Sequence, residues 1–276
     1  MTHDEAFLQA IREAPDDDGP RLIYADWLEE HGQTDRAEFI RVQCRRFGIS
    51  ETDPNVPGLQ ARAEELLRDN WDAWVGPLRE LARRMHAWRS ERWMYEAYHP
   101  DRLPHFRRGF VETIAVEAEG FLEHANELLA LVPLRELLLW GAGRCARDLA
   151  HCPQLTGLKI LGFADYFRDP LTARDAPVLA ASPYLHGLSA LYLGWNSLSD
   201  EGVEALTRAR WLESLVTLDL SQNGITDAGA LALAYCPYLG RLQTLFLRRN
   251  DITSRGRTAL AASRHLRRVS RLQLND

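Results

Sequence analysis

A leucine-rich segment recurs along the second half of the chain at a constant interval of 27 residues. Its four copies begin at Leu188, Leu215, Leu242 and Val269. In every copy leucine also stands three and five residues after the first position. This spacing of two alternates apolar with other residues, as in a strand with one buried face. A fixed period of this length is typical of a solenoid built from stacked repeats.

The residues between these strands repeat as well. An asparagine closes each of the first three segments, at Asn196, Asn223 and Asn250. Ser199, Thr226 and Thr253 follow, each directly before an apolar stretch with helical spacing. A hydroxyl at that place can accept a hydrogen bond from the free N–H groups of a helix start. Each repeat is therefore predicted to contain a strand, a turn closed by asparagine, and a helix.

Neither the strand nor the helix of one repeat can bury its apolar face alone, so the repeats must stack. We predict an α/β solenoid with parallel strands along its concave face. The pattern resembles leucine-rich repeats of the ribonuclease-inhibitor type, which form a horseshoe.

The pattern continues upstream with less regular spacing. Leu155 opens the segment LTGLKILGF, Leu134 opens LRELLLWGA, and Val111 opens VETIAV. In the first two of these segments Phe163 and Ala142 stand at the asparagine position. Residues 164–170 are expected to form a protruding loop.

The first 46 residues have a different pattern, which predicts three short helices. Thr2 and Glu5 form a capping box, and Pro15 ends the first helix. The acidic run Asp16-Asp17-Asp18 is interpreted as a turn that leads into a second helix, rather than as a calcium loop. The apolar face expected for that second helix consists of Leu22, Ile23, Trp27 and Leu28. Gly32 ends it, and Thr34 begins the third helix.

A tryptophan-rich stretch over residues 58–98 is predicted to be helical and to shield the N-terminal edge of the solenoid. Its tryptophans are Trp71, Trp74, Trp88 and Trp93. The predicted domains are therefore a helical module over 1–46, a helical linker and cap over 47–105, and a leucine-rich-repeat solenoid over 106–276.

The segments PDDDGPRLIYADWLEEHG and DRAEFIRVQ closely resemble the bacterial repeat-companion domain. That short all-α module precedes leucine-rich repeats in large families of planctomycete-like and myxobacterial-like proteins. The segment RRGFVETIAV also resembles the way in which those proteins enter their repeats. The resemblance implies recognition more than a reaction.

Catalytic and metal-binding motifs are missing from the sequence. The nine histidines are dispersed, and there is no HExxH motif, phosphate loop or nucleophile elbow. We therefore expect a protein that is not an enzyme and that holds no metal and no cofactor. Cys44, Cys145, Cys152 and Cys236 are widely spaced and are expected to be buried thiols. The sequence shows neither a signal peptide nor a membrane-spanning stretch, so a cytoplasmic location is expected.

Exposed strand positions should carry the binding site. The central column, between the second and third leucines, is predicted to contain Leu138, Lys159, Tyr192, Asp219, Phe246 and Gln273. From this column and the positions after the third leucine, the predicted partner-binding residues are Trp140, Lys159, Tyr192, Trp195, Asp219, Gln222, Phe246, Arg248 and Arg249. Aromatic and arginine side chains are enriched in protein interfaces.

Two binding functions remain open from the sequence, beside a third alternative of an enzyme whose site is assembled from unlinked residues or completed by another subunit. The first is an adaptor or sensor subunit that recognises a protein partner through the concave face. The alternative is nucleic-acid binding through the C-terminal repeats, because residues 241–276 carry nine arginines against two aspartates. Residues 1–40 are acidic, with eleven Asp/Glu against three Arg, and the whole chain has a net charge of −6. An edge-strand contact through residues 269–274 is a further possibility.

Overall fold

The computed structural model describes residues 2–85, 106–163 and 169–274. The chain divides into two compact units. Unit 1 contains residues 1–114 and 124–135, and unit 2 contains residues 115–123 and 136–276. Trp88, Trp93 and positions 164–168 of the expected loop lie outside the described residues. The predicted domain ranges stay predictions, because compactness alone does not define a domain.

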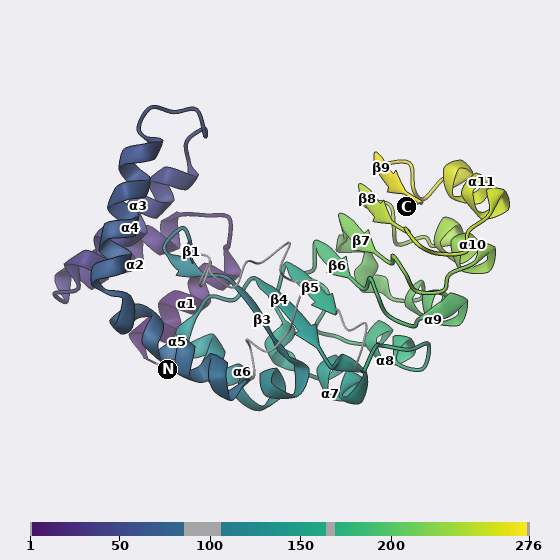
Figure 1. Ribbon diagram of the computed structural model, residues 1–276, viewed down its shortest axis with the longest axis horizontal. Helices are drawn as coiled ribbons and strands as arrows, with labels where there is room; N and C mark the ends of the chain where they lie inside the picture. Colours follow the sequence, from purple (N-terminus) through teal and green to yellow (C-terminus); the bar gives the residue numbers. More distant parts are fainter. Residues whose placement is uncertain (1, 86–105, 164–168, 275–276) are drawn as a thin grey trace. The chain divides into compact units, whose positions relative to one another are not determined.

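Unit 1 is mainly helical (Figure 1). Its elements are α1 (His3–Glu13), α2 (Gly19–Glu30), α3 (Thr34–Phe47), α4 (Val56–Asp69), α5 (Trp71–Arg84) and the antiparallel strands β1 (Phe106–Arg107) and β2 (Phe110–Val111). The three helices predicted at the start of the chain are confirmed. The capping box is also present, since the Glu5 N–H donates to Thr2 Oγ1 at 3.2 Å and the Thr2 N–H donates to Glu5 Oε2 at 2.8 Å.

The predicted apolar face of α2 is confirmed at Leu28, and Trp27 is half-buried against the same core, but the face is wrong at its other two positions. Leu22 and Ile23 are 39% and 61% exposed. Arg21, Tyr24 and Ala25 are buried with Leu28 in their place. These positions have the three- and four-residue spacing of one helical face, so the periodicity was present in the sequence. It was masked because an arginine occupies a core position.

That arginine forms a buried ion pair with a residue 91 positions later in the chain. The Arg21 and Glu112 side chains are 0% and 2% exposed, and Arg21 Nη2 donates to Glu112 Oε1. Arg21 Nη1 also donates to the Asp17 carbonyl oxygen at 2.8 Å. Burying two charges is tolerated only when each is paired and hydrogen-bonded. The pair therefore fixes the segment after β2 against α2.

The acidic turn is held by further arginines. Arg135 Nη1 donates to Asp16 Oδ1 at 2.8 Å, and this bond lowers the pKa of the Asp16 carboxyl. Arg108 Nε lies 3.3 Å from Asp18 Oδ1. Asp18 precedes α2 without a side-chain capping bond, so the run works as a charged turn paired with arginines.

The tryptophan-rich stretch is not one helix in its described part, because α4 ends at Asp69 and α5 begins at Trp71. Trp74 packs against Phe39 with 5.2 Å between the ring centres. Both rings belong to a group of four that surrounds Arg36. The guanidinium carbon of Arg36 lies 5.0–5.7 Å from the ring centres of Phe39, Trp74, Phe106 and Phe110. Burial lowers the pKa of Arg36 to about 10.

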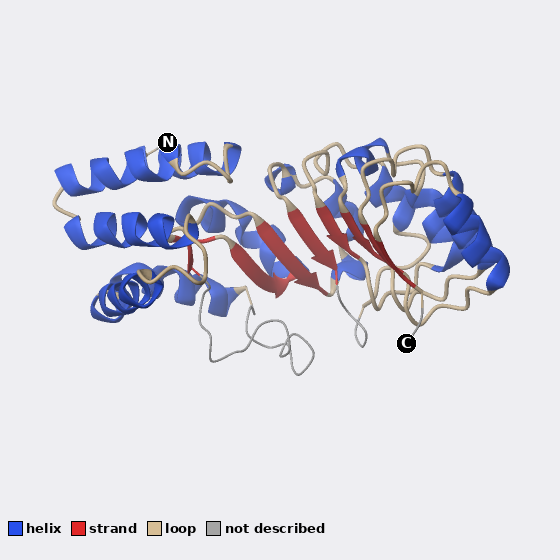
Figure 2. Ribbon diagram, turned by 90° about the horizontal axis from the view of Figure 1, so that it is seen from above, coloured by secondary structure: helices blue, strands red, loops and turns tan. Residues whose placement is uncertain are grey.

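Unit 2 consists of stacked strand-and-helix repeats, with the strands on one side and the helices on the other (Figures 1 and 2). Its strands are β4 (Glu136–Trp140), β5 (Ile160–Phe163), β6 (Ala190–Tyr192), β7 (Thr217–Asp219), β8 (Thr244–Phe246) and β9 (Arg271–Gln273). Its helices are α7 (Ala146–Ala150), α8 (Ala176–Ala180), α9 (Ser199–Leu206), α10 (Asp227–Tyr235) and α11 (Ser254–Ala262), with 3₁₀ turns η1 (Ala142–Arg144), η2 (Pro153–Leu155) and η3 (Arg210–Ser214). At the boundary between the units lie β3 (Thr113–Glu117) and α6 (Ala118–Leu131).

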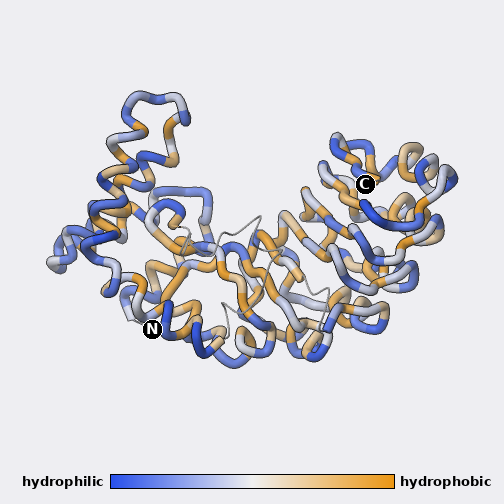
Figure 3. Tube along the Cα trace, viewed as in Figure 1, coloured by the Kyte–Doolittle hydropathy of each residue, from blue (hydrophilic) through white to orange (hydrophobic). Residues whose placement is uncertain are grey.

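Within the described residues the main sheet has seven strands in the order β3-β4-β5-β6-β7-β8-β9. All pairs from β4 to β9 are parallel, as predicted. The register places Leu191, Leu218, Leu245 and Leu272 beside one another in one column. The first three are at most 3% exposed, so this column lies in the core. In Figure 3 these strands carry hydrophobic residues, whereas hydrophilic stretches follow the loops.

One upstream repeat was placed in the wrong register. Leu158, not Leu155, is the first leucine, because Leu161 pairs with both Leu137 and Leu191. Leu155 ends η2 and is buried there. The error arose because Leu155, Leu158 and Leu161 are evenly spaced by three residues, so the local sequence fits either register.

The asparagines join neighbouring repeats through buried side-chain amides. Asn223 Nδ2 donates to the Leu193 oxygen of the previous repeat at 2.8 Å and to Ser221 O in its own repeat at 3.1 Å. Its Oδ1 accepts from the Leu198 N–H at 3.2 Å. Asn196 and Asn250 make corresponding bonds. We call these three residues the asparagine ladder.

A second link joins the helices. Asp200 Oδ1 accepts from the N–H groups of Thr226 and Gly229 at 2.8 Å each, at the start of the following helix α10. Asp227 does the same for Thr253 and Gly256 ahead of α11. Glycine is required at these two positions, since a Cβ would lie 2.6 Å or less from the aspartate oxygen.

The threonine caps are confirmed, but the serine cap is wrong. Thr226 and Thr253 accept from Ala228 N and Arg255 N at 3.3 Å each. Ser199 lies inside α9 with φ 54°, and its hydroxyl donates to Glu201. In the preceding repeat, Ala173 lies near the start of α9, with its Cα 3.2 Å from where a Cβ of Gly202 would lie. Alanine has no carboxylate, so it cannot make the link that Asp200 and Asp227 make to the next helices.

The four cysteines are free and buried, as predicted. Among the described residues, no helix has the length and apolar character needed to span a bilayer.

Replacing Asn223 by leucine should destabilise unit 2 by about 2–4 kcal/mol, because the Leu198 N–H and the Leu193 oxygen lose their buried partner. Urea unfolding followed by circular dichroism measures this change. Gln243→Leu is the control, since that amide is exposed. Equal losses in the two variants would show that the ladder contributes nothing specific.

Replacing Glu112 by leucine should lower the free energy of unfolding by about 3–5 kcal/mol, because Arg21 is left buried without its carboxylate. Adding Arg21→Met should restore part of this loss, which a double-mutant cycle in urea would measure. Glu204→Leu removes an exposed partner from Arg208 and should cost less than about 1 kcal/mol. Additive losses at residues 21 and 112 would contradict the pairing.

Candidate functional site

The turn after each strand holds one residue in a left-handed conformation. Trp195, Gln222 and Arg249 have φ angles of 63°, 53° and 54°. They occupy the same place in successive repeats, directly before an asparagine of the ladder. Gly141 stands at this place in the β4 repeat, with φ 69°. The turn therefore demands a conformation that glycine adopts freely and other residues do not.

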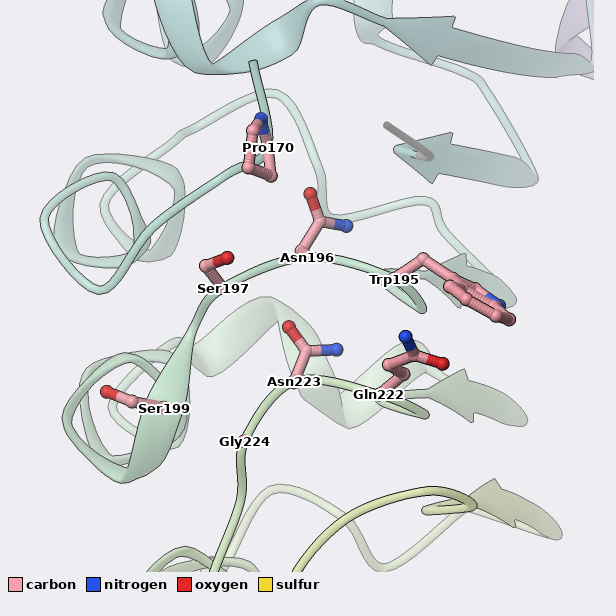
Figure 4. A pocket seen from close by; sticks show the side chains of 8 residues that line it. All are labelled: Pro170, Trp195, Asn196, Ser197, Ser199, Gln222, Asn223 and Gly224. Carbon is pink, nitrogen blue, oxygen red and sulfur yellow. The ribbon is translucent and has the colours of Figure 1, made fainter. Parts of the chain in front are cut away.

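Holding a non-glycine residue there costs about 1–3 kcal/mol. The asparagine ladder resists relaxation, because the adjacent amides bond the strand ends on both sides. Figure 4 shows Trp195 and Gln222 in one column beside Asn196 and Asn223 in the next. The strained backbone thus sets the direction in which these side chains leave the chain before any partner binds.

The second row of the site is the central strand column. The observed column is Leu138, Gly162, Tyr192, Asp219, Phe246 and Gln273. Lys159 is therefore not in this column, which corrects the prediction. It precedes β5, where its carbonyl oxygen accepts from the N–H groups of Ser189 and Ala190. Gly162 takes its place, and a Cβ there would lie 2.5 Å from Leu138 Cδ2.

Trp140 is also misplaced by the prediction. Its side chain is 7% exposed and belongs to the buried set. It stands one residue before the left-handed Gly141, whereas the half-buried Trp195 is itself the left-handed residue of its repeat. A shift of one residue in this turn changes which side of the chain a side chain takes.

The remaining seven predicted site residues lie together. They line one hollow of about 480 Å³ on the strand side of unit 2. The lining residues are Tyr192, Trp195, Asp219, Ser221, Gln222, Phe246, Arg248, Arg249, Arg271 and Gln273. We call this surface the arginine hollow. Whether its residues bind a partner stays a prediction.

The arginines are placed over aromatic rings. The guanidinium carbon of Arg249 lies 5.1 Å from the Trp195 ring centre, and that of Arg271 lies 5.2 Å from the ring centre of Phe246. Cation–π contacts of this kind orient the guanidinium without neutralising it. In the described part of the chain, Arg248, Arg249 and Arg271 form no ion pair. Three exposed positive charges therefore face outward from the hollow.

The polar groups between the arginines are only partly satisfied. Asp219 Oδ1 accepts from the Ser221 N–H at 2.8 Å. Gln222 Oε1 is buried yet finds no hydrogen-bond donor among the described residues. Burial of the Tyr192 hydroxyl, and then the nearby carboxylates of Glu136 and Asp219, raise the pKa of Tyr192. The hollow therefore contains one buried hydrogen-bond acceptor, Gln222 Oε1, and its charge changes from negative at Asp219 to positive at the arginines.

A second hollow lies beside the first. Trp195 and Gln222 line both, and the second is completed by Pro170, Asn196, Ser197, Ser199, Asn223 and Gly224 (Figure 4). The two left-handed side chains thus form the wall between the hollows. The direction of the Trp195 and Gln222 side chains therefore affects the shape of both hollows.

The side chains of the arginine hollow can supply apolar contact, positive charge and hydrogen bonds. Its groups are aromatic rings, guanidinium groups, amides and one carboxylate, and it contains no histidine or cysteine. No group of three metal-binding side chains occurs in the ranges 2–85, 106–163 and 169–274. The thiols lie elsewhere, and burial raises the pKa of Cys145 to about 11.

Sequence reasoning missed two lining residues. They are Ser221 and Arg271, which are not among the predicted partner-binding residues. Arg271 stands two residues before Gln273 in β9, so both lie on the same face of the strand. The alternation of the strand was the available signal.

Comparisons with known proteins identify the repeat type. Residues 186–206 and 212–234 match a family model described as Leucine Rich repeat. These segments contain β6, α9, β7 and most of α10, so they cover two successive repeats of unit 2. A comparison with proteins of curated function found no match.

Replacing Gln222 by glycine should leave stability unchanged or raise it by up to about 1 kcal/mol, because φ 53° is free of strain for glycine. Ser221→Gly, whose position lacks a positive φ, should instead lower it by about 0.5–1 kcal/mol. Thermal unfolding of both variants tests the difference. A loss at Gln222 as large as at Ser221 would show that the turn stores no strain.

Proposed function

We propose that this leucine-rich-repeat chain is a non-catalytic recognition module that binds a protein partner through the arginine hollow. Leucine-rich repeats generally mediate contacts between proteins. The observation that carries the proposal is the set of aromatic and arginine side chains held rigidly on the strand side of unit 2. The chain would act as an adaptor or sensor subunit of a larger complex, and the partner would be the protein that it recruits or senses.

The energetics favour such a role. Side chains fixed before binding lose little conformational freedom when a partner docks, so more of the contact energy appears as affinity. Tryptophan and arginine are also the residues that most often carry binding energy in interfaces. The strain at Trp195, Gln222 and Arg249 is of the kind found at functional sites.

The proposal includes the finer assignments made from the sequence. The repeats would be of the ribonuclease-inhibitor type and form a horseshoe, with a bacterial repeat-companion module at the N-terminus. The chain would act in the cytoplasm. The buried Arg21–Glu112 pair supports the companion module, because it joins the motif PDDDGPRL to the motif RRGFVE.

An affinity pull-down from native-source lysate tests the proposal. The bait is the full chain, compared with a variant in which Tyr192, Trp195, Phe246 and Arg249 are all alanine. A protein retained by the first and lost from the second is the expected result. Once that partner is purified, Trp195→Ala and Phe246→Ala should each weaken its affinity by about 2 kcal/mol or more.

The control variant carries Tyr235→Ala and Arg257→Ala, which remove exposed side chains from α10 and α11. It should retain the partner. All samples are run with and without nuclease. Prey that disappear only after nuclease would favour nucleic-acid binding, and identical prey from all three baits would exclude the arginine hollow as the binding surface.

A further inference from the structure

The arginine hollow carries a charge pattern that narrows the chemistry of its partner; this inference rests on the proposed function. Arg248, Arg249 and Arg271 lie around it without ion-pair partners among the described residues, and Asp219 is its single carboxylate. The hollow therefore has an excess of positive charge, which lies at the β8 and β9 repeats. Most of the basic groups that form ion pairs among the described residues belong to unit 1, for example Arg41 with Asp26 and Glu29.

We propose that the arginine hollow binds an extended acidic segment of a protein partner, with its carboxylates over β8 and β9. The guanidinium groups of Arg249 and Arg271 each lie over an aromatic ring and form no ion pair among the described residues. A guanidinium presents paired N–H donors with the spacing of a carboxylate. Two guanidinium groups on adjacent repeats would therefore receive two acidic side chains.

The buried acceptor supports a peptide. Gln222 Oε1 lies within the wall of the hollow with no donor from the described chain. A buried acceptor without a donor has lost its hydrogen bonds to water, and a donor from a ligand would restore one. A backbone N–H of an extended segment supplies such a donor at every second residue on one side. The rings of Trp195 and Phe246 would contact the stems of its side chains.

The other end of the same surface argues against a polyanion. Asp219 and Glu136 both act on the Tyr192 hydroxyl, so negative charge lies on the β4 to β7 side. Strands are spaced about 4.8 Å apart, so a segment that crosses from β9 to β7 reaches this charge within about 10 Å. A nucleic acid carries phosphate at every step and would be repelled there. A peptide can confine its carboxylates to one end.

Binding of labelled synthetic peptides to the full chain tests this inference. The probes are fluorescent nonapeptides of Ser, Gly, Phe and four glutamates, with matched sets in which glutamine or lysine replaces glutamate. An oligonucleotide of twelve uridines is the polyanion without peptide groups. Fluorescence anisotropy at physiological salt gives each Kd.

We expect the glutamate peptides to bind and the glutamine peptides to bind at least about tenfold more weakly, because a charge-assisted pair is lost at each exchange. The variant Arg249→Gln/Arg271→Gln should weaken glutamate-peptide binding by about tenfold or more. The control Arg257→Gln/Arg267→Gln removes the same charge from exposed positions outside the hollow and should change the Kd less than about twofold. Gln222→Ala should weaken the binding of all peptides equally, since its acceptor would bind a backbone N–H, which every peptide has.

Four outcomes would overturn the inference. They are equal binding of glutamine or lysine peptides, no glutamate peptide with a Kd below about 1 mM, equal losses in the two double variants, or tighter binding of the oligonucleotide through Arg249 and Arg271. If the lysate partner still depends on the hollow in any of these cases, the proposed function stands and only the acidic chemistry fails. If the partner and the glutamate peptides are both indifferent to the hollow, both proposals fail.

Discussion

The buried asparagine amide is the interaction on which the repeat structure depends. A side-chain amide can donate and accept at once, so Asn223 satisfies backbone groups of its own repeat and of the previous one. A leucine core alone is indifferent to small slips between repeats, because apolar contact has no direction. The asparagine ladder supplies that direction, and the aspartate links from Asp200 and Asp227 repeat the same principle at the helix starts.

The strained residues lie directly beside the ladder. The turn after the strand holds the residue before the asparagine position at a positive φ, and in three repeats this residue is Trp195, Gln222 or Arg249. The amides of the asparagine ladder that join the repeats therefore also hold the turns that carry these side chains. A glycine would relieve the strain, as it does at Gly141, but it would leave nothing to present.

Sequence reasoning succeeded where the physical signal was periodic. The constant interval gave the leucine columns, the parallel sheet and seven residues of the hollow. It failed where one residue could satisfy two patterns: the evenly spaced leucines before β5 displaced Lys159, and a core arginine hid the true face of α2. It could not find the left-handed row either, because tryptophan, glutamine and arginine have no common preference for that conformation. Gly141 was the only local sign.

The arginines show why residue type alone does not define a site. Arg21 is buried against Glu112, and Arg36 is enclosed by four rings, so both serve the packing of unit 1. Arg249 and Arg271 also contact rings, yet they are exposed and form no ion pair with a carboxylate of the described chain. A guanidinium that is neutralised by a carboxylate, as in Arg21, or enclosed within the fold, as in Arg36, has no charge to offer a partner. Arg249 and Arg271 are oriented but neither neutralised nor enclosed, and this difference is why the proposed binding surface lies in unit 2.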